Sequence, residues 1–293
     1  MKTASPRYRM VAIDLDGTLL DPLGRVSPAS KAAVHRALQA GLLVVFATGR
    51  NWTESQTVLE AVAHYDTAVF VGGAMVVDTQ NRITLHRTLM DPALARELCA
   101  DLESAGQAVL AMQDASDAGV DYLVTDRIEL DAHLLHWLSR TTTTIERVSD
   151  LATRDHAHTV RIGAVISDAN VQAIHRLLDG KYAERAFYHF IRVPSHGVEV
   201  IEVFDPSVNK WEGISQVARQ HGIAPEQIIT IGDDINDVHM IRNAGLGVAM
   251  GNAIPAIKQI ARRVIAPNSE DGLAAFLNEI VDTHLVEPQA EEH

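Results

Sequence analysis

The chain has 293 residues with 47% apolar and 22% charged side chains, an ordinary globular composition that is long enough for two domains. Its formal net charge of -13 argues against non-specific nucleic-acid binding, so a bound anion would need a local cation or a metal. The single cysteine, Cys99, excludes an intrachain disulfide and favours a cytoplasmic location. The sequence shows neither the apolar core of a signal peptide nor an apolar run long enough to span a bilayer, which argues against a membrane partner.

The first predicted element is a buried strand that ends in two carboxylates. Apolar residues 11–13 lead to Asp14 and Asp16, and Gly17 then turns the chain away from the strand. Open α/β sheets build their sites at this edge. Because neighbouring carboxylates repel each other unless a cation or a proton intervenes, the pair predicts a hard metal ion, most simply Mg²⁺. Taken alone, an Asp-x-Asp-Gly run is equally an ordinary turn.

Helices and strands then alternate along the chain. They are a helix from Ser27 to Gly41, a strand at 42–47, a helix at 51–63 and a strand at 67–71. This βαβαβ order predicts a parallel sheet with right-handed crossovers. Gly72-Gly73 interrupts the pattern, and a hairpin is expected at 74–78 and 82–86.

From about Thr88 the order of elements changes, which predicts a separate α+β domain inserted into the first one. Its expected helices lie at 92–105, 130–139 and 169–178, and its strands at 108–112, 120–125, 159–166, 186–193 and 198–204. The parallel pattern resumes with a helix at 210–221 and a strand at 227–231. We therefore expect a Rossmann-like α/β core formed by residues 1–86 and 200–293, with an inserted cap domain at 87–199.

Polar residues follow several predicted strands or begin the next helix. They are Asp14, Asp16, Thr48, Lys210, Asp233, Asn236 and Asp237. The ends of parallel strands meet at one edge of a sheet, so we expect these side chains to lie together. Asp233 could complete a Mg²⁺ site with Asp14 and a backbone carbonyl, while Lys210 and the Thr48 hydroxyl could donate to phosphate oxygens.

These motifs, in this order, resemble those of the haloacid dehalogenase-like superfamily of phosphatases, in particular its Cof-type branch. Asp14-Leu15-Asp16-Gly17-Thr18 resembles the first motif, Thr48-Gly49-Arg50 the second, Lys210 the third and residues 232–237 the fourth; residues 248–253 and 270–272 resemble later Cof-type segments. The insertion between Thr48 and Lys210 lies where the Cof-type cap is found. One departure is Gly72-Gly73, where Cof-type chains often carry Asn-Gly.

The resemblance implies a phospho-aspartyl mechanism. Asp14 would attack phosphorus, and Asp16, starting protonated, would protonate the leaving alcohol and then activate water. Mg²⁺ would be held by Asp14, Asp233 and the backbone carbonyl of Asp16. Lys210 would offset the charge on the transferring oxygens.

The remaining motif residues would hold the phosphate and support the metal site. Thr48, the Gly49 amide and Asn236 would bind phosphate together with Lys210. Asp237 would orient metal-bound waters or Lys210. Arg50 is interpreted as a surface residue.

The leading interpretation is a Mg²⁺-dependent phosphatase of small phosphorylated metabolites, such as sugar, flavin or pyridoxal phosphates. The alternatives are a phosphomutase of the same superfamily and a metabolite-binding module without turnover. A P-loop nucleotidase is excluded because the chain lacks Gly-x-x-x-x-Gly-Lys-Ser/Thr. His156 and His158 are interpreted as a polar loop, and Cys99 as a packed side chain. We expect a monomer or a homodimer.

Overall fold

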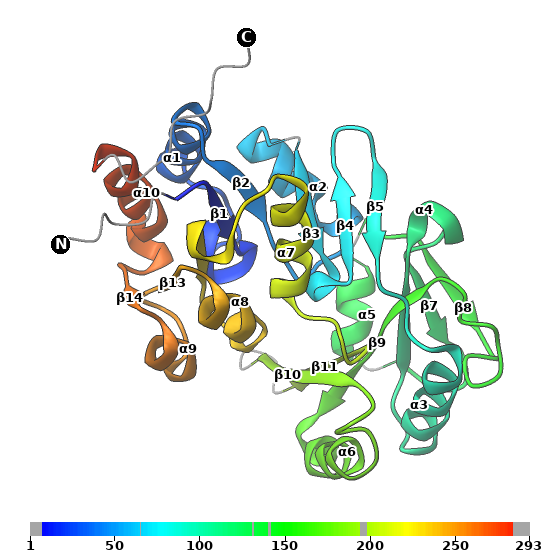
Figure 1. The fold of residues 1–293 in the computed structure, drawn as a ribbon. Helices are drawn as coiled ribbons and strands as arrows, with labels where there is room; N and C mark the ends of the chain where they lie inside the picture. The colour runs from blue at the N-terminus through cyan, green and yellow to red at the C-terminus, as the bar shows by residue number, and fades with distance from the viewer. Residues whose placement is uncertain (1–7, 65, 131, 140–141, 194–197, 284–293) are drawn as a thin grey trace. The chain divides into compact units, whose positions relative to one another are not determined.

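The computed structural model describes residues 8–64, 66–130, 132–139, 142–193 and 198–283. Contacts divide them into two compact units (Figure 1). The core unit holds the residues up to Arg50, Ser55–Leu85 and those from Asn209 onward, and the cap unit holds Asn51–Glu54 and His86–Val208. Among the described residues, no helix has both the length and the apolar character needed to cross a bilayer.

The core unit is built on a parallel sheet of five strands in the order β14-β13-β12-β1-β2. The strands are β1 (Met10–Ile13), β2 (Leu43–Phe46), β12 (Ile228–Gly232), β13 (Leu246–Ala249) and β14 (Arg263–Val264). Strand β1 lies between β12 and β2 and is completely buried, as expected for a strand covered on both faces. The predicted α/β fold with a parallel core sheet is confirmed.

Two groups of helices pack around this sheet. They are α1 (Pro28–Gln39), α2 (Trp52–Val62) and α10 (Gly272–Asp282), and α7 (Lys210–Gln220), α8 (Val238–Asn243) and α9 (Pro255–Ile260). Helix α1 packs on α10, whereas α8 packs on both α7 and α9. Ser27 caps α1 by accepting a hydrogen bond of 3.0 Å from the Ser30 amide, with Pro28 as the first helical residue.

The third strand differs from the prediction. Strand β3 (Thr67–Phe70) forms a separate sheet with β4 (Met75–Asp78) and β5 (Ile83–Arg87), and one parallel bridge, Ala47 to Val69, links it to the chain after β2. The turn at Val71–Gly73 has a positive φ at all three residues, which reverses the chain into an antiparallel partner. The predicted hairpin is present, but the parallel sheet does not continue through β3.

The cap unit is an inserted α+β structure with a six-stranded sheet in the order β10-β11-β9-β6-β7-β8. Its strands are β6 (Val109–Gln113), β7 (Tyr122–Thr125), β8 (Ile145–Val148), β9 (Thr159–Ser167), β10 (Phe187–Val193) and β11 (Val198–Phe204). Its helices are α3 (Pro92–Ser104), α4 (Ala115–Ala118), α5 (Ala132–Leu138) and α6 (Asp168–Lys181). Neither α4 nor β8 was predicted from the sequence.

An apolar cluster joins α3 and α6 to one face of the cap sheet. It includes Leu98, Cys99, Ile162, Ile174 and Ile201, so Cys99 is a packed side chain, as predicted. Strand β11 pairs with both β10 and β9, which places residues 200–208 in the cap unit, whereas we expected the core to resume at residue 200.

His156 has a structural role in the cap unit. Its Nδ1 lies 2.9 Å from Thr159 Oγ1, and its Nε2 lies 2.8 Å from the Leu151 carbonyl oxygen. With both ring nitrogens occupied in a buried loop, His156 is a poor metal ligand.

Candidate active site

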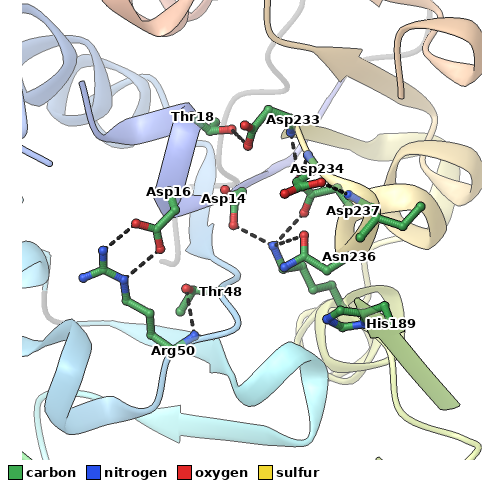
Figure 2. Close-up of polar contacts among 12 residues, drawn as sticks. Asp14, Asp16, Thr18, Thr48, Arg50, His189, Asp233, Asp234, Asn236 and Asp237 are labelled. Carbon is green, nitrogen blue, oxygen red and sulfur yellow. Dashed lines mark hydrogen bonds and ion pairs between the residues drawn. The ribbon is translucent and has the colours of Figure 1, made fainter. Parts of the chain in front are cut away.

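The predicted site residues of the core unit gather at one edge of its sheet (Figure 2). Asp14 directly follows β1, Thr48 follows the end of β2, and Asp233 follows β12. Lys210 is the first residue of α7, where Asn209 caps the helix by accepting a hydrogen bond of 3.2 Å from the Glu212 amide. Asp14, Thr48 and Asp233 meet because the parallel strands β1, β2 and β12 end on the same side of the sheet, and the start of α7 brings Lys210 to the same place.

Lys210 is a fully buried cation shared by two carboxylates. Its Nζ lies 2.6 Å from Asp14 Oδ1 and 2.6 Å from Asp237 Oδ1, and it donates a longer contact of 3.4 Å to Asn236 Oδ1. Burial alone would lower the pKa of Lys210, but the charges of Asp14 and Asp237 outweigh it and hold that pKa above its ordinary value. Lys210 is therefore held charged beside Asp14.

Asp14 lies in a site with more negative than positive charge. Burial raises the pKa of the Asp14 carboxyl well above its usual range, Lys210 opposes this shift, and Asp237, Asp233 and Asp16 add to it. Burial and the neighbouring Asp237 likewise raise the pKa of Asp233 to about 7. One buried lysine is thus insufficient to compensate these carboxylates.

A divalent cation fits this set of oxygen donors. Carboxylate oxygens of Asp14, Asp233 and Asp237 all lie within 4.8 Å of one another. The oxygens of Asp237 are already engaged, because Oδ1 pairs with Lys210 and Oδ2 accepts the Asp233 and Asp234 amides at 2.8 and 3.1 Å. Asp14 and Asp233 are therefore the two side chains best able to bind a metal, while Asp237 holds Lys210 and the loop in place.

Two glycines allow the site loops to approach one another. A Cβ on Gly17, whose φ is +75°, would lie 2.1 Å from Asp233 Oδ2. A Cβ on Gly73, whose φ is +106°, would lie 2.0 Å from the Asn209 carbonyl oxygen, next to Lys210. The Gly72-Gly73 pair, which departs from the Cof-type pattern, therefore lets the turn after β3 pack against the start of α7.

Asp16 lies apart from the acidic cluster and pairs with Arg50. Its carboxylate accepts a hydrogen bond of 2.7 Å from Arg50 Nε and a second one from Nη2 (Figure 2). The Arg50 amide donates to Thr48 Oγ1 at 3.1 Å, and the Arg50 carbonyl accepts from the Val71 amide at 2.9 Å. The second motif loop, which also contains Gly49, thus positions the arginine that binds Asp16.

These motifs also identify the family of the chain. The sequence profile of a family described as haloacid dehalogenase-like hydrolase matches residues 11–277, which include most of both units. The chain belongs to the haloacid dehalogenase-like hydrolase family. This confirms the family and the enzyme class that the four motifs predicted.

Curated relatives and solved structures agree with this assignment. The hydrolase is 30% identical over 271 residues to a 5-amino-6-(5-phospho-D-ribitylamino)uracil phosphatase of Bacillus subtilis, over 92% of this chain and 96% of the relative. It is 28% identical to a pyridoxal phosphate phosphatase of Escherichia coli, over 92% and 97% of the two chains. A haloacid dehalogenase-like hydrolase from Bacteroides thetaiotaomicron has the same fold, with a TM-score of 0.76 at 20% identity over 93% and 99%.

A buried polar network in the cap unit of this hydrolase was not predicted from its sequence. Arg161 and Glu202 form an ion pair, Glu202 Oε2 lies 2.8 Å from His189 Nε2, and Arg161 Nη2 donates to the Tyr122 hydroxyl at 3.3 Å. Arg161 and Glu202 adjoin Ile162 and Ile201, which face α3 and α6, so the network lies on the opposite face of the sheet. Within the described part of the chain, His189 Nδ1 is buried without a hydrogen-bond partner.

Two further residues that contact the site, Arg50 and Asn252, were not predicted to do so. Arg50 is a partner of Asp16 rather than an uninvolved surface residue. Asn252 contacts Asp233 and Gly17. A signal was present in each case, because Arg50 belongs to the second motif and Asn252 to a segment that resembles the family. Neither signal indicates which side chain the residue contacts.

Proposed function

We propose that this hydrolase is a Mg²⁺-dependent phosphatase of small phosphorylated metabolites and that it acts through a phospho-aspartyl intermediate on Asp14. The observation that carries the proposal is the buried Asp14 carboxylate, paired at 2.6 Å with the buried ammonium of Lys210 and adjacent to Asp233. A nucleophilic carboxylate that meets a phosphate needs this kind of positive surrounding to overcome charge repulsion. The phosphatases among its relatives support the reaction class.

In the first step an oxygen of Asp14 forms a bond to phosphorus while the bond from phosphorus to the leaving oxygen breaks. Asp16, once it is released from Arg50 and protonated by solvent, gives that proton to the leaving oxygen. Lys210 fixes the Asp14 carboxylate and offsets charge on the phosphoryl oxygens. The Thr48 hydroxyl and the Asn236 amide bind those oxygens.

In the second step Asp16 takes a proton from water as the water oxygen attacks phosphorus. The bond between phosphorus and Asp14 breaks, which releases phosphate and restores the carboxylate. In the structure Asp16 is held by Arg50, so this ion pair must open before Asp16 can reach a leaving oxygen or a water. The backbone amide of Gly49, in the same loop as Arg50, is assigned to phosphate binding.

The metal site is assigned to Asp14, Asp233 and the backbone carbonyl of Asp16. When bound, Mg²⁺ would neutralise charge on the carboxylates and the phosphate. The raised pKa values of Asp14 and Asp233 support the assignment, because carboxyl groups that ionise with difficulty in a buried cluster are stabilised by a cation. Asp237 keeps Lys210 in place through its carboxylate.

Substrate choice is assigned to the cap unit. Its buried network of Arg161, His189 and Glu202 offers hydrogen-bonding groups, and the unpartnered Nδ1 of His189 could accept or donate one more. A His189→Phe variant is expected to raise KM for the preferred substrate more than it lowers kcat. The single cysteine favours the cytoplasm, where such metabolites occur.

The test is phosphate release from a panel that includes sugar phosphates, flavin mononucleotide, pyridoxal phosphate and 5-amino-6-(5-phospho-D-ribitylamino)uracil. Wild type and Asp14→Asn are assayed with Mg²⁺ and with chelator. We expect release that requires Mg²⁺ and disappears in the variant. Release that survives in Asp14→Asn would show that the nucleophile is wrong. No release from any substrate, with transfer between phosphate positions of a bisphosphate, would favour a phosphomutase.

A further inference from the structure

Asn252 lies in the loop between β13 and α9 and bridges the two loops assigned to the metal. Its Nδ2 donates a hydrogen bond of 2.8 Å to the Gly17 carbonyl oxygen and a longer contact of 3.4 Å to Asp233 Oδ2. Gly17 belongs to the first motif and Asp233 to the fourth. One side-chain amide therefore joins two segments that are far apart in the sequence.

The orientation of this amide is fixed by a third contact. Asn252 Oδ1 accepts a hydrogen bond of 2.9 Å from the backbone amide of Asn268. A backbone N–H can only donate, so the oxygen of Asn252 must face it and the NH₂ group must face Gly17 and Asp233. Asn268 is in turn held in place by a hydrogen bond of 2.7 Å from its Nδ2 to the Leu20 carbonyl oxygen.

The same loop also holds the backbone around Asp233. The Ile254 amide donates to the Asp233 carbonyl oxygen at 2.9 Å, and the Met250 amide donates to the Gly232 carbonyl oxygen at 3.1 Å. The loop thus fixes the main chain of Asp233, while the side chain of Asn252 contacts its carboxylate. Among the described residues, the side chain of Asn252 contacts Gly17, Asp233 and Asn268. None of these is a residue assigned to phosphate binding.

We propose that Asn252 is a positioning residue of the metal site, which holds the carboxylate of Asp233 and the peptide of Gly17 at the separation that a divalent cation requires. The inference rests on the proposed function, because that function assigns the metal to Asp233 and to the carbonyl that precedes Gly17. Asn252 acts through these groups and does not bind phosphate. Its loss weakens metal binding and leaves the chemistry of the loaded enzyme in place.

The test is Mg²⁺ binding to substrate-free protein by isothermal titration calorimetry. Wild type, Asn252→Ala and Asn252→Leu are compared, because leucine keeps the volume of the side chain but removes its hydrogen bonds. Asn252 is exposed, so neither change leaves a cavity in the core. Asn278→Ala is the matched control, since the Asn278 side chain accepts a single hydrogen bond of 3.0 Å from Arg36 Nη1, between α10 and α1.

We expect both Asn252 variants to bind Mg²⁺ about 10- to 100-fold more weakly, the usual effect of removing a group that orients a metal ligand. Their melting temperature in chelator should fall only slightly, because the lost hydrogen bonds are exposed, and saturating Mg²⁺ should restore most of kcat. The Asn278 control should keep wild-type Mg²⁺ affinity.

Two results would overturn the inference alone. One is unchanged Mg²⁺ affinity in both Asn252 variants when the wild type binds the ion. The other is a loss of kcat that saturating Mg²⁺ does not restore. A wild-type protein that binds no Mg²⁺ would instead overturn the inference together with the metal assignment of the proposed function.

Discussion

Asp233→Asn is expected to stabilise the metal-free protein above neutral pH while it abolishes the benefit of Mg²⁺. The physical reason is the cost of ionising a buried carboxyl next to other carboxylates, which raises the pKa of Asp233 to about 7. In the unfolded chain this pKa is about 3.9. Between these two values the native state binds the proton more tightly, so the contribution of Asp233 to stability is favourable at low pH and is lost as pH rises towards 7.

The size of the effect follows from this difference in pKa. It corresponds to about 4 kcal/mol of lost stability once the pH exceeds both values. Asparagine is neutral, so it removes this cost, but it also disturbs the contacts of 3.3 Å from Thr18 Oγ1 and 3.4 Å from Asn252 Nδ2. These contacts are long, and we allow about 1 kcal/mol for them. The net gain at pH 8 is therefore about 2–3 kcal/mol, or about 5–10 °C in Tm.

The assay is thermal unfolding of chelator-treated protein at pH 5 and pH 8, repeated with Mg²⁺. Wild type should gain stability from Mg²⁺ at pH 8, and Asp233→Asn should not. At pH 5 the variant should gain little, because Asp233 is then largely protonated in the wild type. Asp234→Asn is the matched control, since it removes the same charge one residue away and should change stability by about 0.5 kcal/mol or less. A variant that is less stable than the wild type at pH 8 without metal, or equally stabilised at both pH values, would contradict the raised pKa of Asp233.

Three further predictions follow from burial and close approach. Lys210→Met should destabilise the protein by about 3–5 kcal/mol in urea unfolding, because it leaves two buried carboxylates without their cation. It should also lower kcat by about 10²-fold or more. Unchanged stability would contradict the buried pairing of Lys210 with these carboxylates. Gly73→Ala should destabilise the protein and lower kcat, because the added Cβ clashes with Asn209. Gly24→Ala is the control: Gly24 also has a positive φ but has open space around it, so this variant should show only the smaller conformational cost. Equal effects of the two variants in unfolding and activity assays would argue against the close approach of Gly73 to Asn209. Cys99 should not react with a thiol reagent in the native protein, because burial raises the pKa of its thiol and shields it from the reagent. It should react once the protein is unfolded. Rapid labelling of the native protein would contradict the buried position of Cys99.

The parallel core was predictable because its signals are local. A buried strand leaves a run of apolar residues, as at Met10–Ile13, and a helix start leaves a capping residue, as at Ser27. Alternation of these signals predicts parallel strands, and parallel strands bring their ends to one edge. The order of residues along the chain is therefore sufficient to predict that Asp14 and Asp233 lie close together.

Strand partners were less predictable because pairing depends on contacts between distant segments. Strand β3 has the apolar pattern of a parallel strand, yet the turn with positive φ at Val71–Gly73 gives it an antiparallel neighbour. Strand β11 could equally have led into the core, but it pairs with β9 and β10. Strand β8 was missed because its short, largely exposed Ile-Glu-Arg-Val sequence shows little alternation of apolar and polar residues.

Motif order and the apolar pattern of the strands were sufficient to predict which side chains meet at the edge of the core sheet, because both are properties of the chain alone. How those side chains pair depends on the fold. The fold turns Asp16 towards Arg50, encloses Lys210 between Asp14 and Asp237, and places Asn252 between the loops that contain Gly17 and Asp233. A side chain's partner is set by backbone direction and by close packing between segments that lie from 27 to 235 residues apart, and no local pattern records either.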